Sequence, residues 1–355
     1  MTTRRTIDPY NYFEQLAAKH TPTRSFPKHQ DEGFDKWKEI TLPKVIKTLG
    51  KLPRPVPLNP ELLVEWREDG LVKQRWVIDT QPGLSAVLYI FRPENLAEGE
   101  RRPAILCCHG HGAHGKDPIM GITPDPDRKG VVDRANANYG LVMAKRGFVT
   151  YAIDWLGFGE RSSAAKPFNY DGYGHRDPCN VTSMCATMLG TTLLAMNCHD
   201  ASQATDFVCD QPYVDADNLG VMGLSLGGTM TTWMMLTDAR FRAADVMCYA
   251  GPFYDVAYRT YNVCGSQVTP NLFGIVDTPD LLGMIAPRPM LVELGVYDSC
   301  FHIDHTLNDH YRRLEAIYAS AGADNLLELD LFPFEHAWGD QKSDAFFRKH
   351  LQASW

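Results

Sequence analysis

The sequence lacks a basic cluster. No run of five or more lysines and arginines occurs in its 355 residues, and 43 acidic residues outnumber 35 basic ones, which gives a formal net charge of −8. Proteins that bind nucleic acid usually present a basic patch to the phosphates. We therefore expect no nucleic acid partner.

Long apolar stretches are also missing. Arg4 and Arg5 are not followed by an apolar segment of the kind found in secretory signals. No stretch approaches the ~20 apolar residues that a membrane-spanning helix needs. We therefore expect a soluble, cytoplasmic protein with no membrane partner.

The nine cysteines include no C-x-x-C pair. They are odd in number and spread from Cys107 to Cys300, in a chain large enough to build its core without disulfides. We expect reduced cysteines that pack as small apolar side chains, including Cys300 beside a candidate site residue.

A proline-rich segment, residues 52–60, separates two patterns. Before it, apolar residues at helical spacing predict two helical segments within residues 8–50, the second broken near Pro43. After it, the first three apolar runs are joined by short turns, which indicates antiparallel strands, and the later runs alternate with helical stretches, as buried parallel strands do. The predicted strands are residues 62–67, 71–78, 86–91, 104–108, 148–154, 219–222, 244–249, 290–294 and 326–332, and a terminal helix covers 343–351.

These patterns predict an α/β fold with a mostly parallel central sheet and helices on both faces. Residues 1–60 form an N-terminal helical extension packed on the core, and residues 61–355 form one domain. Two irregular segments, 155–190 and 251–280, follow strands on the carboxyl side of the sheet, where ligand sites of open α/β folds lie. We expect them to form a lid or substrate loops. Four of their side chains are candidates either to line a substrate site or to pack within the lid: Tyr173, His175, Tyr254 and Tyr258.

The central motif is Gly223-x-Ser225-x-Gly227, between a predicted strand and an apolar helix. Three fixed letters also occur by chance, but this context is typical of a nucleophile elbow, in which a sharp turn exposes the serine hydroxyl above a sheet. The backbone N–H of Leu226 then faces any negative charge that forms at the serine.

Candidate partners for Ser225 follow in the order acid, then histidine, that this elbow requires. Asp298 lies just past the strand 290–294, and His336 lies between the last strand and the terminal helix. We favour Asp298 over Glu293, which should point into the flank of the sheet, and over Asp304. His302, His305 and His310 are expected to be solvated or capping residues.

The glycine-rich loop 109–115 can approach a substrate closely, and the N–H of His111 is the candidate second oxyanion donor. The same loop supports a rival interpretation. The spacing His109-x-His111-x-x-His114 resembles the start of the zinc motif of metallo-β-lactamase-type hydrolases, although Ala113 stands at its acidic position.

With these residues in order, the chain resembles the α/β-hydrolase superfamily, and within it the dienelactone-hydrolase and acetyl-xylan-esterase-like branch. Dienelactone hydrolase itself uses a cysteine nucleophile, so Ser225 favours an ordinary ester. The motifs are residues 108–112 (CHGHG), 152–161 (AIDWLGFGER), 221–228 (VMGLSLGG), 281–290 (LLGMIAPRPM) and 334–338 (FEHAW).

The resemblance implies a serine carboxylic-ester hydrolase that acts on a small acyl group such as acetyl, with a small-molecule ester as substrate. Ser225, His336 and Asp298 form its triad, Leu226 and His111 its oxyanion hole, and neither a cofactor nor a metal is needed. A non-catalytic binding protein on the same fold and a small-amide hydrolase are the alternatives.

Overall fold

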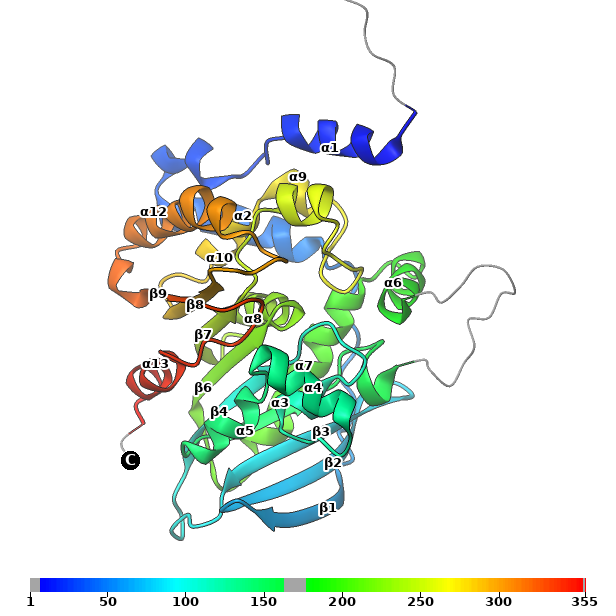
Figure 1. Cartoon of the computed structure of the whole chain (residues 1–355), viewed down its shortest axis with the longest axis vertical. Coiled ribbons are helices and arrows are strands. Elements are labelled where there is room, and N and C mark those ends of the chain that lie inside the picture. The colour runs from blue at the N-terminus through cyan, green and yellow to red at the C-terminus, as the bar shows by residue number, and fades with distance from the viewer. Residues whose placement is uncertain (1–6, 163–176, 354) are drawn as a thin grey trace, which may run out of the picture.

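A computed structural model describes residues 7–162, 177–353 and 355, and their strands form one nine-stranded sheet (Figure 1). The strand order is β1-β2-β3-β5-β4-β6-β7-β8-β9. All nine predicted strands are present, although β6 begins five residues earlier and β7 three residues earlier than predicted. Their bounds are β1 (Glu61–Glu68), β2 (Leu71–Gln81), β3 (Leu84–Pro93), β4 (Arg102–Cys108), β5 (Val149–Ile153), β6 (Val214–Leu224), β7 (Phe241–Met247), β8 (Met290–Gly295) and β9 (Leu327–Phe332).

The sheet changes direction at β5. Strands β1, β2 and β3 pair antiparallel, and β3 pairs antiparallel with β5, whereas every pair from β5 to β9 is parallel. The inner strands β5 and β8 are buried at every position, while the edge strand β1 is mostly exposed. The carboxyl ends of the parallel strands therefore share one edge, where a ligand site is expected.

Helices cover both faces of the sheet. Trp233 and Ala201, from the long helices α8 and α7, belong to the core on one face, and Met143 and Phe347, from α5 and α13, to the core on the other. No helix among the described residues has the length and apolar composition needed to cross a membrane. The helices of the sheet region include α3 (Lys116–Ile119), α4 (Pro126–Ala135), α5 (Tyr139–Lys145), α7 (Leu193–Cys209), α8 (Leu226–Thr237), α11 (Ile303–His305), α12 (Arg312–Ser320) and α13 (Ser343–His350).

The N-terminal region contains α1 (Pro9–Lys19) and α2 (Phe34–Lys47). The predicted break near Pro43 is wrong, because α2 runs through it. Pro43 is exposed, so water can satisfy the carbonyl that loses its helical partner, while burial of Trp37 and Val45 on the opposite face holds the helix together.

The two irregular segments are partly helical. Residues 163–176 lie outside the described part of the chain, but the first segment contains α6 (Pro178–Met188), which stands out from the sheet in Figure 1. The second contains a π-helix, η5, followed by two short helices. The remaining bounds are η5 (Tyr254–Arg259), α9 (Leu272–Ile275), α10 (Thr278–Gly283), a second π-helix η6 (Thr306–Tyr311), and the 3₁₀ helices η1 (Phe26–Lys28), η2 (Gln30–Glu32), η3 (Gly159–Arg161) and η7 (Asp324–Leu326).

Candidate active site

Ser225 occupies a strained turn between β6 and α8. Its φ of 63° and ψ of −118° are unusual for a residue with a side chain, and such strain costs roughly 1–3 kcal/mol. The Ser225 N–H donates to the Met247 carbonyl over 2.9 Å, which holds the turn in place. A Cβ added to Gly223 would lie 2.5 Å from Gly227 C, and one added to Gly227 would lie 2.0 Å from Cys108 O. Both flanking positions therefore require glycine.

A cavity of about 150 Å³ opens beside this serine. Ser225 and His336 both line it, together with His111 from the loop that follows β4. Its remaining wall is largely apolar and comes from the region of α3, α4 and α5. The apolar lining side chains include Pro118, Ile119, Val131, Ala135 and Ala137.

His336 is oriented by Asp298. His336 Nδ1 lies 2.8 Å from Asp298 Oδ2, and Asp298 Oδ1 accepts the backbone N–H groups of Cys300 and Phe301 over 2.7 and 2.9 Å. Burial raises the pKa of the Asp298 carboxyl, but these hydrogen bonds and the charge of His336 outweigh it and hold the pKa below its usual range. The Phe301 ring also stacks on the imidazole, with centroids 5.8 Å apart and planes 11° apart. Asp298 is therefore an ionised acceptor that fixes the Nδ1–H tautomer of His336.

Glu293, the competing acid, has other partners. Its carboxylate accepts the Ser343 hydroxyl over 2.7 Å and the Gly339 N–H over 2.8 Å, and burial raises its pKa to about 7. These bonds tie β8 to the start of α13. The other competitor, Asp304, is an exposed residue of α11.

The two candidate oxyanion donors belong to segments that meet at Ser225. Leu226 is the buried first residue of α8, where the backbone N–H has no partner within the helix. The loop that carries His111 passes close to the elbow, since a Cβ on Gly110 would lie 3.6 Å from Ser225 Cβ. The His111 side chain points toward Asp177, with Nε2 3.2 Å from Asp177 Oδ2.

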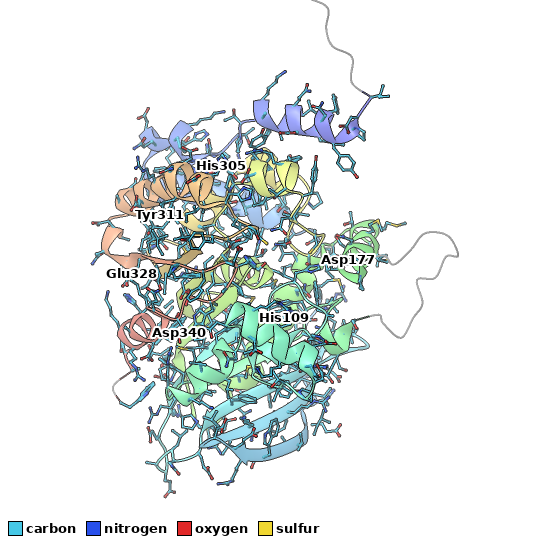
Figure 2. The ribbon with its side chains drawn as sticks, viewed as in Figure 1. His109, Asp177, His305, Tyr311, Glu328 and Asp340 are labelled. Atoms are coloured by element: carbon cyan, nitrogen blue, oxygen red, sulfur yellow. The ribbon has the colours of Figure 1, made fainter. Side chains whose placement is uncertain are left out.

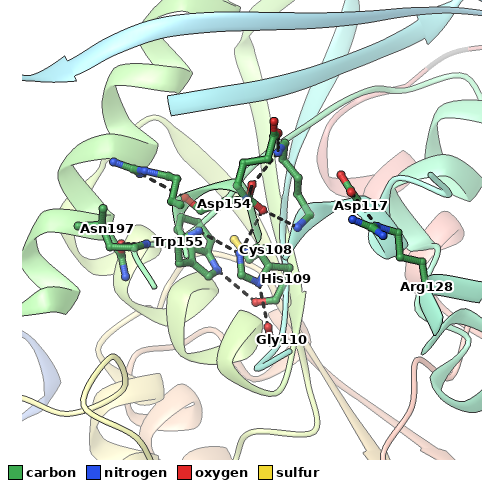
Figure 3. A network of polar contacts seen from close by, with 12 residues as sticks. Cys108, His109, Gly110, Asp117, Arg128, Asp154, Trp155 and Asn197 are labelled. Atoms are coloured by element: carbon green, nitrogen blue, oxygen red, sulfur yellow. Dashed lines mark hydrogen bonds and ion pairs between the residues drawn. The ribbon is translucent and has the colours of Figure 1, made fainter. Parts of the chain in front are cut away.

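The three loop histidines do not converge on one metal. His109 is buried, its Nε2 accepts the Trp155 N–H over 3.0 Å, and its Nδ1 lies 2.8 Å from the Gly110 carbonyl (Figure 3). Burial lowers the pKa of His109 to about 4, so the ring is a neutral structural link. The rival metal site suggested by the His109, His111 and His114 spacing does not form, because both ring nitrogens of His109 are engaged with neighbouring backbone groups.

A buried ion pair supports these loops and was not anticipated from the sequence. Lys116 Nζ lies 2.6 Å from both Asp154 Oδ2 and Glu160 Oε2, and Asp154 Oδ1 accepts the Lys116 N–H over 2.8 Å (Figure 3). Lysine is almost never fully buried without a partner, so the glycine-rich loop and the loop after β5 form one connected unit.

Cys248 is a second residue that the sequence did not single out. It follows β7 with a φ of 48°, and its Sγ lies within 4.8 Å of ligand atoms of both Asp298 and His336. Its thiol is 3.4 Å from the Ala337 carbonyl. No sequence signal marks it, because Cys248 lies inside the predicted strand 244–249, whereas β7 ends at Met247.

Of the candidate substrate residues, the two that the structure describes, Tyr254 and Tyr258, do not line this cavity. Tyr173 and His175 lie outside the described residues. Tyr258 lines a pocket between α1 and α9, and Tyr254 lines a second pocket beside it. Ser225 lines neither pocket. Their placement adds no support for contact with a substrate held at Ser225.

Comparisons with known proteins identify the family. The model of the Abhydrolase family matches residues 2–316. The chain is also 26% identical over 287 residues to the Bacillus subtilis protein named "Putative hydrolase YtaP". This alignment covers 79% of this chain and 87% of that protein.

Solved structures of esterases share the fold. The crystal structure of a "putative acetyl xylan esterase" from Bacteroides fragilis aligns with a TM-score of 0.73 at 18% identity, over 94% of this chain and 84% of that one. A glucuronoyl esterase from Solibacter usitatus aligns with a TM-score of 0.64 at 16% identity, over 91% and 94%. The predicted α/β-hydrolase fold, with acetyl xylan esterases among the similar structures, is confirmed. Because the family model spans most of the chain, the protein belongs to the Abhydrolase family.

Proposed function

We propose that the protein is a serine carboxylic-ester hydrolase that acts through the triad Ser225, His336 and Asp298. The observation that carries the proposal is the strained serine at the end of β6, which shares one cavity with an imidazole held by a buried carboxylate. A serine hydroxyl is a weak nucleophile until a base takes its proton, and the base needs an acid that fixes its tautomer.

The reaction then runs in two halves. Ser225 Oγ attacks the ester carbonyl while His336 Nε2 takes the hydroxyl proton, and Asp298 stabilises the imidazolium. The backbone N–H groups of Leu226 and His111 donate to the oxyanion. His336 returns the proton to the leaving alcohol, and the acyl-enzyme is hydrolysed by a water molecule from which His336 removes a proton.

The cavity favours a short acyl group. Its volume of about 150 Å³ is below the roughly 300–1,000 Å³ of pockets that hold drug-sized ligands. The esterase names of the similar structures agree with a small ester as substrate. We therefore propose an acetyl ester or one of similar size.

The test is the initial rate of p-nitrophenyl acetate hydrolysis by the wild type and by Ser225→Ala. Removal of the nucleophile should lower kcat by at least about 10³-fold, because only the oxyanion hole and binding remain. Ser202→Ala, a serine of α7 that contacts Asp238, is the matched control and should retain the wild-type rate.

A serine-directed fluorophosphonate gives a second readout. Intact mass should rise by one adduct in the wild type and in Ser202→Ala but not in Ser225→Ala. An unchanged rate of p-nitrophenyl acetate hydrolysis in Ser225→Ala would contradict the proposal. Faster cleavage of p-nitroacetanilide than of the ester would assign a small-amide hydrolase, and a wild type inert to both substrates and to the fluorophosphonate would assign a binding protein.

A further inference from the structure

Three segments that are distant in sequence bring metal-binding atoms together beside the cavity. His111 comes from the loop after β4, Cys179 from the first turn of α6, and Cys264 from the stretch between η5 and α9. One ligand atom of each lies within 4.8 Å of the others. Neither the proposed ester hydrolysis nor the packing role expected for cysteine accounts for this cluster.

The Asp177 carboxylate lies next to two of these ligands. It is the residue before α6, and Figure 2 labels it where that helix begins. Asp177 Oδ2 lies 3.2 Å from His111 Nε2, and Asp177 Oδ1 lies 3.1 Å from Cys179 Sγ. The two sulfurs and the imidazole nitrogen thus lie close to one another, and the Asp177 carboxylate contacts two of these three ligands.

The spacing of these atoms fits a tetrahedral ion. Zinc bonds of about 2.3 Å to sulfur and about 2.0–2.2 Å to nitrogen or oxygen place neighbouring ligands of a tetrahedron about 3.3–3.8 Å apart. Cys179 Sγ lies 3.5 Å from His111 Nε2, and the Asp177 carboxylate is 3.2 Å from the same nitrogen. These two distances are close to those that a tetrahedral ion requires.

Hydrogen bonds outside the cluster hold the two cysteines together. The Gly265 N–H donates to Asn180 Oδ1 over 2.7 Å, and the Ser183 hydroxyl donates to the Gly265 carbonyl over 3.0 Å. A Cβ on Gly265 would lie 2.3 Å from Ser183 Cβ, so glycine permits this close approach. Cys179 and Cys264 are both buried in this arrangement.

The chemistry of the ligands selects the metal. Thiolates with an imidazole favour Zn²⁺, whereas Mg²⁺ and Ca²⁺ prefer all-oxygen sites. We propose that His111, Asp177, Cys179 and Cys264 form a Zn²⁺ site. Binding displaces the two thiol protons to solvent, and the ion joins the glycine-rich loop, α6 and the segment after η5. Because His111 also supplies the proposed oxyanion N–H, the ion fixes the loop that carries this donor.

The test is metal content and cobalt spectroscopy on the full chain. After exposure to excess Zn²⁺ and desalting, the wild type should carry one ion per chain, and Co²⁺ should give the intense visible bands and thiolate-to-cobalt charge-transfer band of a tetrahedral thiolate site. Cys179→Ser and Cys264→Ser should bind the ion at least tenfold more weakly. Cys185→Ser is the matched control, because Cys185 lies on α6 but is exposed and outside the cluster.

Two further variants separate this proposal from others. Ser225→Ala should retain the ion, because Ser225 is not one of the proposed ligands. Metal binding is therefore tested independently of esterase activity, and failure of the esterase proposal would not by itself contradict the zinc site. Asp177→Asn, which removes no thiol, should weaken binding with the fold intact by circular dichroism. A wild type that binds no Zn²⁺, or equal binding by Cys264→Ser, would overturn the site. A peptide map of the denatured, unreduced protein in which Cys179 and Cys264 are joined by a disulfide would also overturn it.

Discussion

Asp298 accepts three hydrogen bonds, of which one comes from His336 and two from the backbone turn that follows β8. The backbone bonds fix the carboxylate independently of the histidine. The imidazole is then held between this carboxylate and the Phe301 ring. The proposed chemistry depends on an Asp298 carboxylate that stays ionised, because only then can it stabilise a positive charge on His336.

Replacement of that carboxylate by an amide should therefore remove activity without removing structure. Asp298→Asn puts an amide group opposite Nδ1, which favours the wrong tautomer of His336, and we expect kcat for p-nitrophenyl acetate to fall by roughly 10³–10⁴-fold. Asp304→Asn changes an exposed acid on α11 and serves as the control. A decrease of less than tenfold in Asp298→Asn would contradict the assigned role.

The conformation of the elbow between β6 and α8 depends on the strands beside it. Gly227 lies against the end of β4, and the Ser225 backbone is held by β7, so three neighbouring strands set the conformation of one turn. The packing of the sheet therefore holds Ser225 in this conformation.

A side chain at Gly227 should break that packing. The added Cβ of Gly227→Ala would meet the Cys108 carbonyl at 2.0 Å, and backbone cannot move as a flexible side chain does. We expect a loss of about 1–3 kcal/mol in the free energy of unfolding in urea, with loss of esterase activity. Gly130→Ala is the control: it lies within α4, where alanine is the better helix former. Equal unfolding midpoints for the two variants would refute this explanation of the motif.

The strands, and the grouping of Ser225, Asp298 and His336 in space, could be predicted because each leaves a local signal: an apolar run, a glycine motif, or a polar residue in the loop after a strand. The α6 helix and the π-helix lie in segments rich in residues that favour turns, and their local pattern gave no helix. The cluster beside the cavity leaves no such signal either. His111 and Cys179 are 68 positions apart, and Asn180 and Gly265, which hold the cysteines, are 85 apart. Only the folded chain brings these side chains together.

The helix α2 belongs to the main core although it precedes the whole sheet in sequence. Trp37 is fully buried there, with its ring 5.0 Å from that of Phe26, and its indole N–H donates to the Arg24 carbonyl over 2.8 Å. The backbone of Arg24 in turn donates to Ile275 at the end of α9. The N-terminal region is thereby connected to the segment that follows η5.

If the N-terminal region and the sheet share one core, they should unfold together. Trp37→Ala leaves a large cavity and an unpaired Arg24 carbonyl, and we expect a loss of about 3–5 kcal/mol in a single urea transition. Tyr12→Ala, which removes a ring of α1 that is 52% exposed, is the control and should change the unfolding free energy by less than about 0.5 kcal/mol. A separate early transition in Trp37→Ala, with esterase activity retained through it, would show instead that residues 1–60 fold as an independent unit. A single transition shifted to lower urea, with activity lost at the same midpoint, would show that α2 is part of the structure that positions Ser225.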